Sequence, residues 1–143
     1  MAISMKGLET YKTDKDLESS EGVWLKFPEG RRLHVLRAGG SNKAFARKFS
    51  QAIKPYRRQM DRGTMDPEKS DELMIDVYLD TVILGWEGFV DDNGNPVPYS
   101  KKVAREFLLA LPEFFNDVVN FASDAATFQI EDAEETAEEL GES

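Results

Sequence analysis

The chain of 143 residues contains no cysteine and only one histidine, His34. Without cysteine there is no disulfide bond and no thiolate nucleophile, so the redox state of the compartment is left open. One histidine and no cysteine are too few residues to assemble a Ser/His/Asp or Cys/His catalytic set. We interpret His34 as an ordinary strand residue, and we expect a protein that is not an enzyme.

Long apolar runs are also absent from the sequence. None approaches the roughly 18 residues that a membrane span needs, and residues 1–7 (MAISMKG) lack the apolar stretch of a secretory signal. We therefore expect no membrane partner and a protein that stays in the cell that made it. The length is that of one domain.

Charge of both signs is plentiful but unevenly spread around a net charge of −9. Between positions 31 and 62 only Asp61 opposes a basic block: Arg31, Arg32, Arg37, Lys43, Arg47, Lys48, Lys54, Arg57, Arg58 and Arg62. From residue 129 to the end, every charged residue is acidic. Such blocks can attract each other within one molecule, between copies or toward different partners. Charge alone does not choose among these.

The N-terminal third predicts an arm followed by a β-hairpin. Residues 1–20 are polar and lack a hydrophobic period, which indicates a flexible arm. Two β-prone runs, 23–27 (VWLKF) and 33–37 (LHVLR), flank a Pro/Gly turn. This arrangement predicts a hairpin over 21–38.

Residues 42–128 predict helices. Over 42–60, apolar residues recur every three or four positions, which is typical of an amphipathic helix: Phe45, Phe49, Ile53, Tyr56 and Met60. A second stripe is basic: Lys43, Arg47, Lys54 and Arg58. Pro55 predicts a kink or an end near Ile53, because proline lacks the N–H that the helix needs.

A second helix is predicted from Pro67 to Leu84, apolar on nearly all sides, and we expect it to be the central core helix. Ser100 is a capping residue for a further helical stretch, which Pro112 divides in two. The predicted fold is α+β and mainly α: an N-terminal β-hairpin, then a small bundle of about four helices. An acidic tail occupies 129–143.

The connector at 84–100 (LGWEGFVDDNGNPVPYS) joins two of these helical stretches. Asn93 and Gly94 tolerate the positive φ of a tight turn, and the prolines that follow keep the returning chain extended. Trp86 supplies a large aromatic anchor. We expect a rigid corner.

Three patterns resemble sites, and each has a simpler interpretation. The Asp-rich turn at 91–95 resembles a calcium loop, but Pro96 replaces the required glycine and Lys102 the bidentate glutamate. The glycines at 39–40 precede a helix but lack the Walker pattern, so capping explains them. The core helix also carries an acidic row of three residues spaced by four: Glu72, Asp76 and Asp80. This row could hold a metal or act in acid–base catalysis. We favour a simpler interpretation, in which it is a solvated face or a face that meets the basic helix. We expect no catalytic residue, metal or cofactor.

The basic block, with its aromatic residues, could also bind nucleic acid. The aromatic residues nevertheless lie on the stripe that a helix buries, where they cannot stack on bases. The net negative charge repels phosphate at longer range. The sequence therefore favours a basic surface that faces a protein or a second copy, with nucleic acid as the less favoured alternative.

The order of several segments resembles the tail assembly chaperones of long-tailed bacteriophages, which are encoded just ahead of the tape-measure protein. The similarity covers roughly residues 20–135. It is carried by RAGGSN at 37–42, LGW at 84–86, GFVDDNG at 88–94, PVPYS at 96–100 and FLLALP at 107–112, followed by Val118, Val119, Ala122 and Phe128.

This resemblance implies a mostly helical fold and a non-catalytic function in the host cytoplasm. Such chaperones are thought to bind the tape-measure protein and to recruit major tail protein subunits, and we expect a homo-oligomer. We hypothesise that Lys43, Arg47, Lys54 and Arg58 form the partner-binding surface, and that Trp86 and Phe89 fix the corner that supports it. The alternatives are a structural virion or tail-completion protein and, less favoured, a small nucleic-acid-binding regulator.

Overall fold

The computed structural model describes residues 3–129, and within them the fold is α+β and mainly α, as predicted. The helices are α1 (Lys15–Ser19), α2 (Lys43–Ile53), α3 (Arg57–Asp61), α4 (Pro67–Thr81), α5 (Lys101–Ala110) and α6 (Pro112–Ser123). Single 3-10 turns lie at η1 (Glu9–Tyr11), η2 (Pro28–Gly30), η3 (Lys54–Tyr56) and η4 (Ala125–Phe128). Apart from Gln129, the predicted acidic tail lies outside the described residues.

The strands β1 (Val23–Lys26), β2 (Arg32–Val35) and β3 (Ile83–Glu87) form one antiparallel sheet in that order. The predicted β1–β2 hairpin is confirmed, with Val23 opposite Val35 and Lys26 opposite Arg32. Alternate residues of both strands are buried, because successive side chains of a strand point to opposite faces of the sheet.

The predicted continuation of the core helix to Leu84 is wrong, because residues 83–87 form the third strand. The helix α4 instead ends at Thr81, and Leu33 pairs with Trp86 across β2 and β3. The run Thr81-Val82-Ile83 is β-branched, which disfavours a helix and favours a strand. The free edge of β2 supplies the hydrogen bonds that decide between the two.

The prolines act where the sequence predicted. The helix α2 ends at Ile53, and one 3-10 turn containing Pro55 leads into α3. Pro67 and Pro112 lie in the first turns of α4 and α6. The predicted cap of α5 is also present, since the backbone N–H of Val103 donates to the Ser100 hydroxyl at 3.2 Å.

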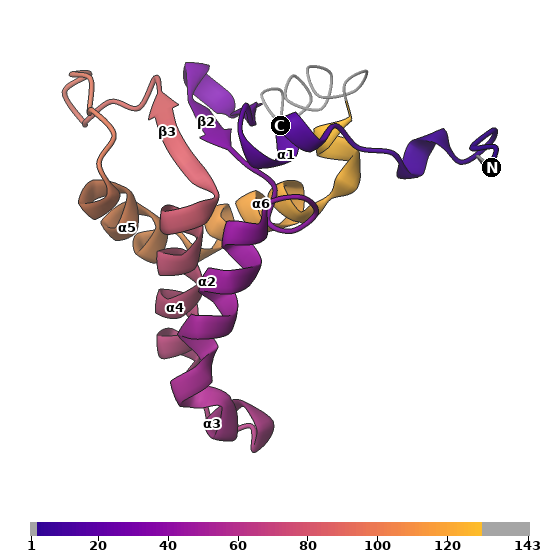
Figure 1. Ribbon diagram of the computed structural model, residues 1–143. Coiled ribbons are helices and arrows are strands. Elements are labelled where there is room, and N and C mark those ends of the chain that lie inside the picture. The colour runs from indigo at the N-terminus through magenta and orange to yellow at the C-terminus, as the bar shows by residue number, and fades with distance from the viewer. Residues whose placement is uncertain (1–2, 130–143) are drawn as a thin grey trace.

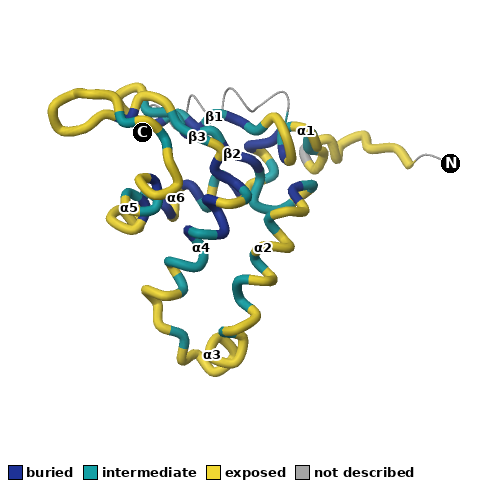
Figure 2. The backbone as a smooth tube through the Cα atoms, turned by 60° about the vertical axis from the view of Figure 1, so that its left-hand side comes forward, coloured by how far each residue is buried: buried dark blue, intermediate teal, exposed yellow. Residues whose placement is uncertain are grey.

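The helices form two groups (Figure 1). The pair α2 and α4 extends away from the sheet with α3 at its far end, whereas α5 and α6 lie close to the sheet. We call residues 43–81 the projection and the remainder the body. Figure 2 shows that buried residues of the projection are confined to the part of α4 near the body.

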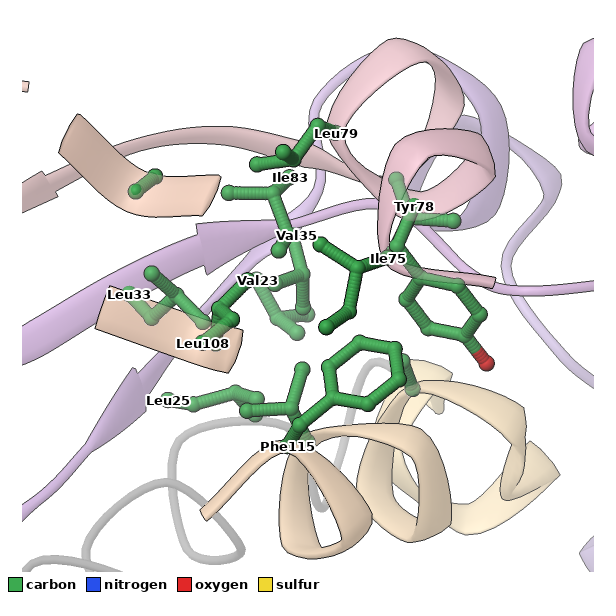
Figure 3. Close-up of a cluster of buried hydrophobic side chains, with 14 of the residues drawn as sticks. Val23, Leu25, Leu33, Val35, Ile75, Tyr78, Leu79, Ile83, Leu108 and Phe115 are labelled. Carbon is green, nitrogen blue, oxygen red and sulfur yellow. The ribbon is translucent and has the colours of Figure 1, made fainter. Parts of the chain in front are cut away.

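The core lies between the inner face of the sheet, the C-terminal part of α4, and α5 and α6 (Figure 3). Its side chains are almost all apolar, and the strands, α4, α5 and α6 all contribute. The labelled members are Val23, Leu25, Leu33, Val35, Ile75, Tyr78, Leu79, Ile83, Leu108 and Phe115. One continuous core therefore joins the sheet to the helices.

Residues 14–20 pack on the body, so the structure differs from the predicted arm of residues 1–20 at its C-terminal end. The side chain of Glu18 is 2% exposed and forms an ion pair with Arg37. The N–H of Ser41 donates to the other carboxylate oxygen at 3.2 Å, and the N–H of Asp14 donates to the Phe128 carbonyl at 3.0 Å. The partner of Glu18 lies 19 residues away, which local sequence pattern does not reveal.

This buried ion pair predicts a pH-dependent contribution to stability. Burial alone raises the pKa of Glu18, but hydrogen bonds from Arg37, Thr13 and Ser41 outweigh it and hold the pKa below its ordinary value. A lowered folded pKa stabilises the fold above the unfolded pKa, and this contribution is lost as pH falls through the folded pKa. Glu18→Gln should lower the free energy of unfolding by about 2 kcal/mol near neutral pH.

Urea denaturation of the wild type and Glu18→Gln at neutral and acidic pH measures this effect. The difference between the two proteins should narrow as pH falls through the folded pKa of Glu18. Glu9→Gln, at an acidic residue with no hydrogen-bonded side-chain partner among the described residues, is the control. A difference that is the same at every pH would contradict the assignment.

Candidate partner-binding site

The helix α2 is strongly amphipathic, yet none of its residues is fully buried. It packs mainly against α4. The ring of Phe45 contacts Tyr78 edge-on, with centroids 5.6 Å apart, and Phe49 at 5.9 Å. A single neighbouring helix covers only part of an apolar stripe, so the rest of this stripe remains accessible.

The accessible part forms a shallow hollow of about 50 Å³ between α2, α3 and α4, which we call the apolar seam. Its lining is apolar except for one serine: Phe49, Ala52, Ile53, Met60, Ser70, Leu73, Met74 and Val77. Met60 is 40% exposed. Methionine side chains adapt to differently shaped partners, so the seam suits apolar side chains of a helix that is not matched residue by residue.

The four basic residues that the sequence singled out lie on α2, η3 and α3, and all are exposed: Lys43, Arg47, Lys54 and Arg58. None of them forms an ion pair within residues 3–129. Lys48 on the same helix, by contrast, lies 3.3 Å from a carboxylate oxygen of Asp80. The first four are therefore available to an acidic partner, whereas Lys48 holds α2 against α4.

Trp86 and Phe89 lie away from the four basic residues, at the end of β3 and just after it. Their rings stack at 4.3 Å, and both contact Phe107 of α5 edge-on, at 6.0 and 5.5 Å. The indole N–H of Trp86 donates to the Val97 carbonyl at 2.9 Å. Figure 1 shows β3 running away from the projection. The rigid corner is present, but it ties the sheet to α5 and does not underlie the basic residues.

The tip of the connector is a turn, as predicted. One carboxylate oxygen of Asp91 accepts hydrogen bonds from the N–H groups of Asn93 and Asn95, each at 2.9 Å. These backbone hydrogen bonds lower the pKa of Asp91. Gly94 has a φ of 82°, and Val90 bridges Pro96. The carboxylate at the first position of the calcium-like pattern thus stabilises the turn.

The acidic row on α4 connects helices. A carboxylate oxygen of Asp76 lies 2.8 Å from Nε of Arg105, and one of Asp80 lies 3.0 Å from Nζ of Lys101. Burial alone raises the pKa of Asp80, but Lys101 and Lys48 outweigh it and hold the pKa below its ordinary value. Of the two predicted alternatives, a solvated face or a face that meets the basic helix, the second holds for Lys48, which pairs with Asp80. Most of the positive charge comes from α5, where Lys101 and Arg105 lie four residues apart.

A second hollow was not predicted. It measures about 480 Å³ and lies between α4 and the α5–α6 corner, and we call it the acidic groove. Its apolar lining is Ile75, Leu108, Leu109, Pro112 and Phe115, and its polar lining is Glu68, Asp71, Glu72 and Asn116. The two halves are about thirty or more residues apart in sequence, so no local motif marks them. The part of the groove that the sequence did mark is Glu72, as a member of the acidic row.

The described helices include none that is both long and apolar enough to cross a lipid bilayer.

The aromatic corner predicts a difference between the two tryptophans. Trp86→Ala should lower the free energy of unfolding by about 3 kcal/mol, because a large ring is removed from a packed cluster. Trp86→Phe retains much of the packing but leaves the Val97 carbonyl without its donor, so it should cost about 1 kcal/mol. Urea denaturation monitored by circular dichroism measures both.

Trp24 is the matched control. It stacks on His34 at 4.5 Å on the face of the sheet opposite the core. Trp24→Ala should cost about 1 kcal/mol, which is the value of one aromatic pair. If Trp24→Ala lowers the free energy of unfolding as much as Trp86→Ala does, the aromatic corner contributes no more to stability than a surface aromatic pair.

Comparison with known proteins identifies the lineage of the chain. No curated protein and no solved structure is significantly similar to it. A family model described as YdaY prophage protein matches residues 40–139, well over half of the sequence. The matched region begins just before α2 and includes the projection, β3, α5 and α6. The chain therefore belongs to the YdaY prophage protein family.

Proposed function

We propose that this prophage protein is a tail assembly chaperone that binds the tape-measure protein and recruits major tail protein subunits in the host cytoplasm. The observation that carries the proposal is the projection, whose amphipathic helix α2 has no fully buried residue. The membership of a prophage family and the resemblance of residues 20–135 to tail assembly chaperones support it.

The apolar seam suits a helical client. A tape-measure protein is a long, helix-rich chain whose apolar stripes need cover until the tail tube encloses them. A client helix lying along the seam would complete a three-helix contact with α2 and α4, and would cover Phe49, Ile53 and Leu73. The contact needs no bond to be made or broken, which agrees with a non-catalytic function.

The size and charge of the site suit reversible binding. The seam is shallow, so each contact is weak, but many copies along one client add up to strong binding that can still be released stepwise. The exposed cations beside the seam attract acidic client residues and orient the helix. The acidic residues from 131 onward would keep a coated client soluble through mutual repulsion.

One observation favours the nucleic-acid alternative: the cations of α2 and α3 other than Lys48 are exposed and form no ion pairs within the described residues. The aromatic residues of α2 argue against it, because Phe45 and Phe49 pack toward α4 and are not presented for stacking on bases. We therefore retain the protein-binding function.

The proposal predicts the effect of charge reversal on client binding. Arg47→Glu with Arg58→Glu should weaken capture of the tape-measure protein of the same prophage by about tenfold or more, because the basic residues orient the client. Co-expression followed by affinity purification measures the amount of soluble tape-measure protein retained. Lys12→Glu with Lys102→Glu changes the net charge equally at exposed positions outside the projection and should retain it.

Equal retention by both double variants would remove the basic residues from the site. The composition of purified phage particles separates the remaining alternative. A chaperone should be absent from finished particles, whereas a structural virion or tail-completion protein should be present in a fixed ratio to the other tail proteins. Binding to nucleic acid that weakens steeply with added salt would favour the regulator.

A further inference from the structure

The projection carries different charges on two sides. Ser70, Leu73 and Val77 of α4 face the apolar seam and α2. Residues of the acidic groove, among them Glu68 and Asp71, lie on the opposite face of the same helix, as the helical period requires. One side of the projection is therefore basic through α2 and α3, and the other side is acidic.

The charges on the two sides are not used up within the molecule. Glu72 forms two long ion pairs, each at 3.9 Å, with Lys69 and Arg105, whereas Glu68 and Asp71 form no ion pair within residues 3–129. The same holds for the arginines at the end of the projection, on or next to α3: Arg57, Arg58 and Arg62. Glu68, Asp71 and these arginines are exposed, and they are therefore available to opposite charges on another molecule.

The apolar parts of the two surfaces also correspond. On the tip of the projection, Met60 is 40% exposed, and the three arginines near it in sequence outnumber the one acidic residue, Asp61. In the acidic groove, Leu109 is 36% exposed and lies among the carboxylates of the rim. An exposed apolar residue on a net basic tip thus corresponds to a groove whose lining is partly apolar and carries three carboxylates, which is the arrangement of a complementary interface.

We propose that the acidic groove of one copy binds the α3 tip, residues 57–62, of a second copy. Met60 of the incoming tip contacts Leu109, and the arginines face Glu68 and Asp71. A thioether side chain fits a hollow of about 480 Å³ without a precise match of shape. The two surfaces differ, so the contact is head-to-tail and can repeat from copy to copy.

This contact leaves most of the apolar seam open. Phe49, Ile53 and Leu73 line the seam and do not line the groove, so a copy held by its tip can still bind a client helix. A head-to-tail row would present successive seams in one direction. The inference concerns contacts between copies only, and it stands whether or not the client is a tape-measure protein.

Sedimentation of the purified full-length protein over a range of concentrations tests the proposal. The wild type should self-associate, and less so at high salt, because exposed ion pairs are screened. Glu68→Lys with Asp71→Lys in the groove, or Arg57→Glu with Arg62→Glu in the tip, should each weaken association by about tenfold or more. Arg58 is left unchanged, so the tip variant differs from the one that tests client binding.

Mixing makes the test specific. The groove variant has two basic surfaces and the tip variant two acidic ones, so an equimolar mixture should associate again although neither variant does alone. Glu106→Lys with Asp92→Lys reverses two exposed carboxylates outside the groove and should associate like the wild type. Circular dichroism checks that each variant is folded. If a reversed variant unfolds, Leu109→Asp replaces it, because Leu109 is partly exposed and not part of the core cluster.

Several results would overturn the proposal. A wild type that stays monomeric at high concentration would show that the groove does not bind a second copy. Loss of association in the tip variant but not in the groove variant would show that the tip binds a different surface. A mixture that remains monomeric would exclude direct pairing of the two charged surfaces. None of these results involves the client, so the proposed function could fail or hold independently.

Discussion

The C-terminal half of α4 is buried between the sheet, α2 and α6. Tyr78 lies at its centre, 2% exposed, with its ring edge-on to Phe45 of α2 and to Phe115 of α6. Burial raises the pKa of Tyr78 to about 12, so the phenol stays neutral at neutral pH. One side chain thus joins the projection to the body, and the remaining half of α4 can extend into solvent without weakening the core.

Much of the fold follows from local pattern. The β1–β2 hairpin, the end of α2 at Ile53 and the division at Pro112 were predictable, because alternation, helical period and proline act over a few residues. The β3 strand was not predictable in this way. The β-branched run at 81–83 favours a strand, but the apolar run that begins at residue 73 suits a buried helix, and the choice is made by the free edge of β2, about fifty residues away. The ion pair of Glu18 with Arg37 was likewise not predictable from local pattern, because the two residues are 19 positions apart in sequence.

The two candidate binding surfaces also differ in whether local sequence pattern reveals them. The basic residues of the projection could be identified because they lie on one element and repeat with the helical period. The acidic groove could not, since α4 supplies its rim and the α5–α6 corner much of its floor. The acidic row was visible in the sequence, but its partners Lys101 and Arg105 could be assigned only once α5 was seen to lie beside α4. Sequence periodicity therefore shows which residues share one face of a helix, whereas the partners of that face are set by tertiary packing.

The way the projection is attached explains how a thin pair of helices can act as a binding element. The side chain of Asn42, 3% exposed, donates to the carbonyl of Arg37 at 2.8 Å and to that of Thr81 at 2.9 Å. The bond to Thr81 ties the start of α2 to the end of α4, and the bond to Arg37 ties it to the segment that follows β2. Buried hydrogen bonds of this kind are costly to break, so the direction of the projection is fixed at its base. Its far end has no such bonds to the body and little buried surface, and a surface held in this way can bind a partner without first being ordered.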